Sequence, residues 1–229
     1  CETDFVARSD QFLALIDNIA HHLLQSNAKS VEEVMEEAYC ADASKTISVL
    51  IAEATAAIGE KISLRRFTKY ALSENGIVAS YIHMGGKIGV LTKIITDASA
   101  ESVAELAANI CMQIAASKPQ VVNIADVDAA QVEAEREIFT VQARNEGKPE
   151  NVIAKMVEGR VHKYYKEVCL LEQEYVRDSS LSIKQVLAET EKAVGAKITV
   201  AAFVRYEMGE GIEKRHENFA EEIQKQING

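Results

Sequence analysis

The sequence Gly85-Gly86-Lys87 resembles the end of a phosphate-binding loop, in which backbone N–H groups and a lysine hold a nucleotide. That loop also needs a glycine at the position of Tyr81 and a Ser or Thr at the position of Ile88. The segment lies between two predicted strands, whereas a phosphate-binding loop precedes a helix. We therefore expect a hairpin turn at residues 84–87.

The other reactive side chains do not form a recognisable catalytic group. His21 and His22 lie on a predicted helix, where we expect a hydrogen-bonded surface or boundary histidine. The cysteines are widely spaced, without a C-x-x-C pair: Cys1, Cys40, Cys111 and Cys169. This spacing favours reduced thiols in a cytoplasmic protein over a zinc site or a disulfide framework. We expect no enzymatic activity, no cofactor, no metal and no small-molecule substrate.

The charge balance limits the class of partner. The 229 residues include 25 Lys and Arg against 35 Asp and Glu, which gives a formal net charge of −10. A duplex nucleic acid or an anionic membrane surface would repel such a chain. No apolar run reaches the roughly 20 residues that span a bilayer. The sequence predicts an interaction protein whose partner is neither nucleic acid nor membrane.

In the first half of the chain, the spacing of apolar residues predicts helices up to about residue 59 and strands after it. Residues 7–25 follow a helical period, with an apolar stripe made of Phe12, Ile16, Ile19 and Leu23. A second apolar helix ends near Gly59. Residues 62–72, 77–83 and 88–94 favour strands, and Asn75-Gly76 is typical of a tight hairpin turn. We expect these three strands to form an antiparallel meander.

The second half predicts a helical hairpin. Residues 129–145 and the helix beginning at Pro149 carry narrow apolar stripes and are joined by four residues, so the two helices must run antiparallel. Such a pair can project as a coiled-coil arm or pack flat on the core. The predicted fold class is α+β, with subdomains at 1–96 and 97–229, an inserted arm at 129–166 and a C-terminal helix at 216–227.

The segment Thr3-Asp4-Phe5-Val6 precedes the first long helix and allows two interpretations. Asp4 has the side chain of a helix N-cap, and Phe5 has that of a core residue packed at the helix entry. Alternatively, both residues belong to a partner-binding surface.

Cys1-Glu2-Thr3-Asp4-Phe5-Val6-Ala7-Arg8 closely resembles a signature of the bacterial elongation factor Ts family. Further matches follow in the family's order along the chain: Ile58-Gly59-Glu60-Lys61-Ile62, Arg65-Arg66, His83, Gly86-Lys87-Ile88-Gly89-Val90-Leu91, Ala115-Ala116-Ser117-Lys118-Pro119, Gly147-Lys148-Pro149, Lys155-Met156-Val157-Glu158-Gly159-Arg160, and residues 203–214. Each match is weak alone, but the ordered set is highly specific.

The resemblance implies a guanine-nucleotide exchange factor for elongation factor Tu, the GTPase that delivers aminoacyl-tRNA to the ribosome. It implies two related α+β subdomains and a helical hairpin arm. It also implies that Asp4 and Phe5 enter the nucleotide domain of the GTPase, with Ile58, Gly59 and His83 on the same contact surface. The family has an N-terminal helical module before this core, and we expect the present sequence to lack it. A scaffold that binds a partner through the arm without exchanging nucleotide is the alternative.

Overall fold

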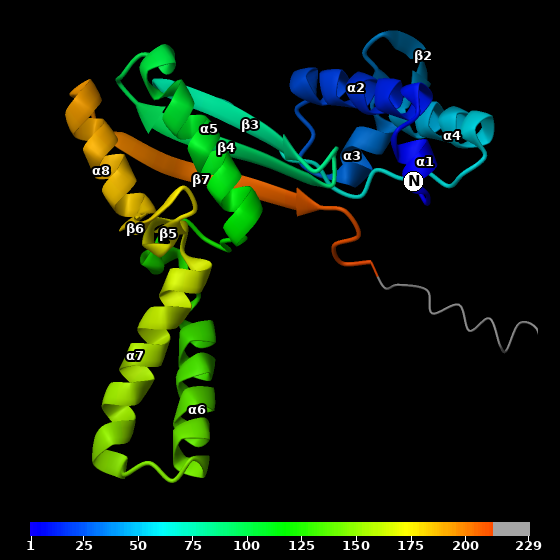
Figure 1. The fold of residues 1–229 in the computed structure, drawn as a ribbon. Coiled ribbons are helices and arrows are strands. Elements are labelled where there is room, and N and C mark those ends of the chain that lie inside the picture. Colours follow the sequence, from blue (N-terminus) through cyan, green and yellow to red (C-terminus); the bar gives the residue numbers. More distant parts are fainter. Residues whose placement is uncertain (213–229) are drawn as a thin grey trace, which may run out of the picture. The chain divides into compact units, whose positions relative to one another are not determined.

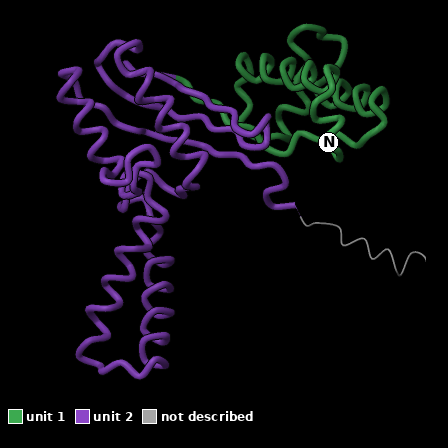
Figure 2. Tube along the Cα trace, viewed as in Figure 1, with its two compact units in different colours: residues 1–71 green, residues 72–229 purple. Residues whose placement is uncertain are grey.

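The computed structural model describes residues 1–212, and the chain divides into two compact units (Figures 1 and 2). Unit 1 comprises Cys1–Ala71 and unit 2 begins at Leu72. The predicted C-terminal helix at residues 216–227 lies outside the described residues. Helices and small antiparallel sheets occur in both units, which supports the predicted α+β class.

Unit 1 packs its helices around a small apolar core. Its elements are α1 (Asp4–Ala7), α2 (Asp10–Gln25), α3 (Val31–Glu36), β1 (Ala38–Tyr39), β2 (Asp42–Thr46) and α4 (Ile47–Ile58). The buried face of α2 consists of Leu15, Ile19 and His22, whereas Ile16 is 47% exposed. Of the predicted stripe, Phe12, Ile19 and Leu23 contact the core of unit 1, and only Ile16 does not belong to it. His22 was also misplaced, because it is only 4% exposed and belongs to the interior of unit 1.

Unit 2 is built on a three-stranded antiparallel sheet of order β3-β4-β7, with bounds Gly76–His83, Ile88–Thr96 and Ile198–Glu207. Alternate residues of β4 are buried, as its period-two pattern predicted. Helices α5 (Ala100–Ser117) and α8 (Ile183–Val194) supply apolar residues to the same core as this sheet.

The predicted meander was wrong in its first strand. Residues 62–72 belong to none of the three sheets, and the strand beside β4 is β7, from the far end of the chain. The boundary between the compact units lies at 71/72, because β4 pairs with β3 on one edge and with β7 on the other, which keeps all three strands in one unit; the sequence predicted a division at 96/97. Gly76 opens β3 without a hairpin before it. A Cβ atom there would lie 2.1 Å from the Ile94 carbonyl oxygen, so close backbone approach requires the glycine.

The predicted arm is a pair of helices, α6 (Ala129–Asn145) and α7 (Glu150–Val168), that extends away from the sheet of unit 2 (Figure 1). Its interior is a separate apolar cluster of Ala143, Ile153, Val157 and Val161. The ion pairs Arg136–Glu158 and Arg144–Glu150 join the two helices. The arm therefore has an apolar interior of its own, while Ile138, Val141 and Val152 remain exposed on its surface.

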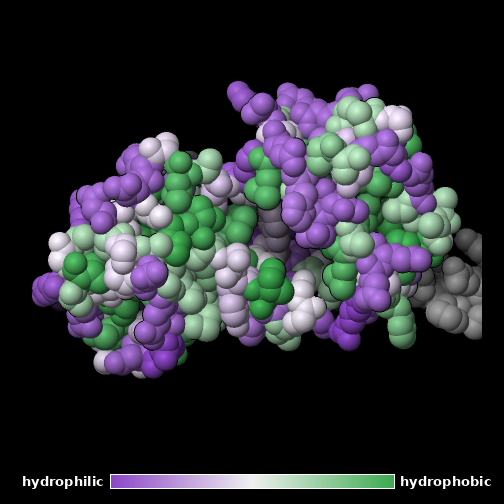
Figure 3. All heavy atoms as spheres, turned by 90° about the horizontal axis from the view of Figure 1, so that it is seen from above, coloured by the Kyte–Doolittle hydropathy of each residue, from purple (hydrophilic) through white to green (hydrophobic). Residues whose placement is uncertain are grey.

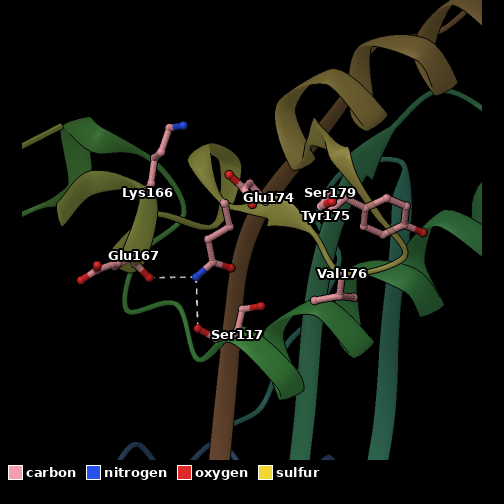
Figure 4. Close-up of a pocket in the computed structure, with 8 residues that line it drawn as sticks. Ser117, Lys166, Glu167, Glu174, Tyr175, Val176 and Ser179 are labelled. Carbon is pink, nitrogen blue, oxygen red and sulfur yellow. Dashed lines mark hydrogen bonds between the residues drawn. The ribbon is translucent and has the colours of Figure 1, made fainter. Parts of the chain in front are cut away.

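Two buried amides attach the base of the arm to the body of unit 2. The side-chain N–H groups of Gln173 donate to the carbonyl oxygens of Ser117, at the end of α5, and Glu167, near the end of α7 (Figure 4). Gln113 donates to Gln173 Oε1 at 3.1 Å, and its own Oε1 accepts from Val176 N–H at 2.8 Å. Because buried polar groups need such partners, the network fixes where α7 leaves the body.

The same hairpin–helix motif occurs once in each unit. In unit 2 the hairpin is β5 (Glu174–Tyr175) with β6 (Asp178–Ser182), followed by α8, and it repeats the arrangement of β1, β2 and α4. In both, the residue before the helix caps its N-terminus and a glycine with positive φ ends it, Gly59 in unit 1 and Gly195 in unit 2. The two units thus share a short hairpin followed by a capped helix.

Candidate functional site

The N-terminal segment presents an aromatic ring to solvent. Thr3 is the N-cap of α1, because its hydroxyl accepts from Val6 N–H, and Asp4 is the first residue of the helix. Phe5 is 90% exposed. The interpretations of Asp4 as the cap and Phe5 as a core residue are therefore wrong. An exposed Phe on a one-turn helix has no role in packing unit 1, which favours a binding role.

Glu60 ties this segment to the end of α4. Its carboxylate accepts from the backbone N–H groups of Glu2 and Thr3, each at 3.0 Å, and from the Thr3 hydroxyl. The Thr3 hydroxyl is the main cause of a lowered pKa for Glu60, and the two backbone bonds add to it. A charged Glu60 therefore holds the residues directly before Phe5 in place.

Ile58 and Gly59 form the turn that positions Glu60. Ile58 is the last residue of α4 and packs partly against the core of unit 1. Gly59 has a φ of +83°, a conformation that an L side chain rarely adopts, and an added Cβ would meet nothing within 4 Å. The backbone angle therefore requires the glycine, and the space beside it is open to a partner.

His83, the fifth predicted site residue, ends β3 in unit 2, whereas the other four belong to unit 1. Its Nδ1 lies 2.9 Å from the Tyr81 hydroxyl oxygen, which fixes the ring. Ile82 and Met84 on either side of it are exposed. Exposed Met208 lies at the same end of the sheet, since its N–H donates to the Lys87 carbonyl oxygen at 2.8 Å. This end of the sheet presents apolar side chains around one histidine.

Sequence reasoning missed two features of these surfaces. Glu60 was not among the predicted site residues, although an acidic residue directly after a helix-ending glycine is placed to accept from nearby N–H groups. The exposure of Ile82, Met84 and Met208 was also missed, because apolar residues at strand ends resemble core positions in sequence.

Within residues 1–212, no group of three or more His, Cys, Asp or Glu side chains could hold a metal ion. No helix in this range is long and apolar enough to cross a membrane. Apolar side chains reach the surface among polar ones in each unit (Figure 3). The candidate residues thus offer an aromatic ring, a histidine and open backbone as contact groups.

Comparison with known proteins gives the family. Residues 2–210 match the family model described as "Elongation factor TS". The chain is 51% identical over 227 residues to elongation factor Ts of Clostridium acetobutylicum, which covers 99% of this chain and 74% of the relative. It is 48% identical to elongation factor Ts of Clostridium botulinum (100% of this chain, 74% of the relative) and of Clostridium perfringens (98% and 73%). By both measures, this chain belongs to the elongation factor Ts family.

Proposed function

We propose that this chain is a guanine-nucleotide exchange factor that binds elongation factor Tu and promotes GDP release during translation elongation. Family membership supports the partner, and one structural observation carries the mechanism: Phe5 is 90% exposed at the end of a segment held by Glu60. A rigidly presented apolar ring is suited to insertion into another protein.

Exchange of this kind follows from thermodynamic linkage. A protein that binds the nucleotide-free GTPase more tightly than the GDP-bound form weakens GDP binding by the same factor. The GTPase holds its diphosphate and magnesium ion with a phosphate loop and carboxylates. Phe5 acts as a wedge between helices of that domain, and burying one Phe supplies roughly 2–3 kcal/mol. The shift disturbs the magnesium and phosphate contacts.

The remaining candidate residues add contact groups for elongation factor Tu on each unit. Asp4 orients the wedge through polar contacts, while Ile58 and Gly59 offer an apolar side chain and open backbone beside the Glu60 anchor. His83 contributes a ring and a hydrogen-bonding group from unit 2. The protein acts in the cytoplasm and only by binding, so none of these residues serves as an acid, a base or a nucleophile.

The alternative is a scaffold that binds a partner through the arm and exchanges nothing. The specific observation in its favour is that the arm has its own apolar cluster, so that it can serve as an independent binding element.

Release of a fluorescent GDP analogue from purified elongation factor Tu tests the proposal. We expect the chain to accelerate release, saturably with its concentration, when unlabelled GDP is in excess. Isothermal titration with nucleotide-free elongation factor Tu measures binding separately. Binding without acceleration would establish the scaffold instead, and absence of both would refute the proposed function.

A further inference from the structure

One face of α7 carries a stripe of basic side chains. Lys155, His162, Lys163 and Lys166 occupy positions i, i+7, i+8 and i+11, with Gly159 at i+4, and all five residues are exposed. Such spacing places them on one side of a helix. The arm interior is formed by Ile153, Val157 and Val161 on the other side. The basic stripe therefore lies outside this interior, and its edge at Gly159 and Lys163 borders a cavity that Glu135 and Phe139 of α6 also line.

None of the stripe lysines forms an ion pair with a described residue, although Glu135 and Glu167 line the same cavity as Lys163. The ion pairs of the arm use arginines: Arg136 with Glu158, Arg144 with Glu150, and Arg160 with Glu146. The remaining acidic residue of α7, Glu167, lies one turn beyond Lys163 at the base of the arm and makes no ion pair with it. On a chain with a formal net charge of −10, an unpaired basic stripe is an exception to the overall charge.

Gly159 in the middle of this stripe is a second, independent observation. Glycine is the poorest helix former after proline, so that an interior position of α7 should favour almost any other residue. A Cβ atom added there would meet nothing within 4 Å, and its backbone angles are helical. Packing within the described residues therefore does not require a glycine. A backbone or side chain that approaches α7 from outside would require one.

We propose that the stripe Lys155–Gly159–His162–Lys163–Lys166 is the docking site for an acidic α-helix of a partner protein. The helix lies along α7, with carboxylates opposite the lysines and an apolar side chain over Gly159. Helical spacing is the reason for preferring a helix: a partner with acidic residues every third or fourth position matches the stripe along its length. The stripe contains no arginine, the residue best suited to phosphate groups, which disfavours nucleic acid.

This site is distinct from the proposed exchange surface, which uses Phe5 and the residues around it. It gives the arm a function of its own, and its partner is defined by chemistry: an amphipathic helix with one acidic face.

Fluorescence anisotropy with a defined probe tests the docking site. The probe is a fluorescein-labelled, alanine-rich helical peptide with glutamates at every third or fourth position along one face and a leucine at its centre. The control peptide has glutamine in place of each glutamate. We expect the full chain to bind the acidic peptide with an affinity that falls as salt rises, and to bind the control at least roughly tenfold more weakly.

Two pairs of variants locate the site. Lys155→Glu/Lys163→Glu/Lys166→Glu should weaken binding roughly tenfold or more. Its matched control, Lys184→Glu/Lys192→Glu/Lys197→Glu, makes the same charge change at exposed positions in and after α8. Gly159→Leu should block close approach while leaving the melting temperature unchanged or higher. Its control is Ala154→Leu, an exposed position of α7 outside the stripe.

Three results would overturn parts of this proposal. Equal losses for both lysine variants would show a general charge effect and overturn the site. Unchanged binding by Gly159→Leu would overturn the close approach of a helix. Tighter binding of a labelled RNA duplex than of the acidic peptide, lost in Lys155→Glu/Lys163→Glu/Lys166→Glu, would overturn the choice of partner.

Discussion

His22 Nε2 lies 2.8 Å from Glu37 Oε2 at the edge of unit 1, where the histidine is buried and the glutamate side chain is 33% exposed. The Cys40 N–H group donates to Nδ1 of the same ring at 3.3 Å, so Nε2 is the nitrogen that donates to the carboxylate. In unit 2, Gln113 joins the side chain of Gln173 to the N–H group of Val176 in the same way. The repeated motif is thus held to an earlier helix of its unit, by an ionisable pair to α2 in unit 1 and by two amides to α5 in unit 2.

Replacing the His22–Glu37 pair of unit 1 by two glutamines, as in unit 2, should leave unit 1 folded. We expect His22→Gln/Glu37→Gln to fold with a stability near that of the parent, because the amides can repeat both hydrogen bonds. His22→Ala should lose about 1–3 kcal/mol, since it removes two hydrogen bonds and the packing of a buried ring. Urea unfolding measures both, and exposed His21→Ala serves as the control. An unchanged His22→Ala variant would show that the pair contributes nothing.

Removal of the Phe5 ring should affect exchange and leave the fold intact. Because the side chain is 90% exposed, Phe5→Ala should leave the melting temperature nearly unchanged. Loss of roughly 2–3 kcal/mol of burial in the complex should slow GDP release on the order of 30-fold or more at limiting factor concentration. Leu13→Ala, at an exposed apolar position of α2, is the matched control. A large drop in melting temperature with intact exchange would assign Phe5 to the core.

The Glu60 anchor should weaken in acid. The pKa of Glu60 is lowered below the ordinary value of 4.5, chiefly by the Thr3 hydroxyl, so the folded state favours the carboxylate. Its contribution is therefore fully present above pH 4.5 and is lost as the pH falls through the lower, folded pKa. NMR chemical shifts of the Glu2 and Thr3 amides should report this loss. In Glu60→Ala, these amides should exchange with solvent faster at pH 7, and their acid transition should disappear. Persistence of the transition would assign it to another group.

The arm should be dispensable for folding. Its helices pack on each other through their own cluster, and closing the gap costs little, since loop entropy grows with the logarithm of length. Replacement of residues 129–166 by a Gly/Ser linker keeps Glu167, whose carbonyl oxygen accepts from Gln173. We expect a folded product by circular dichroism, with GDP release retained. An unfolded product would show that the core depends on the arm, and a folded, inactive one would show that the arm carries binding energy for elongation factor Tu.

Much of the local structure is determined by the sequence alone. The helical period and the turn at Gly147-Lys148-Pro149 were enough to predict the paired helices α6 and α7, although Ile138 and Val141, expected on the apolar stripe of α6, are exposed. Alternation of β-branched residues predicted β4. The ordered family motifs predicted the elongation factor Ts family, which the comparisons confirm. These features succeed because each depends on residues within a few turns of one another.

Only the tertiary structure decided which distant segments meet. Residues 62–72 were predicted as the first strand of the meander, but β4 has β3 on one edge and β7, about a hundred residues later, on the other. The contact of Glu60 with Thr3 and the burial of His22 against Glu37 likewise join separate elements. Local periodicity states which face of an element is apolar. It does not state which other segment covers that face, because that choice depends on the free energy of the whole packed arrangement.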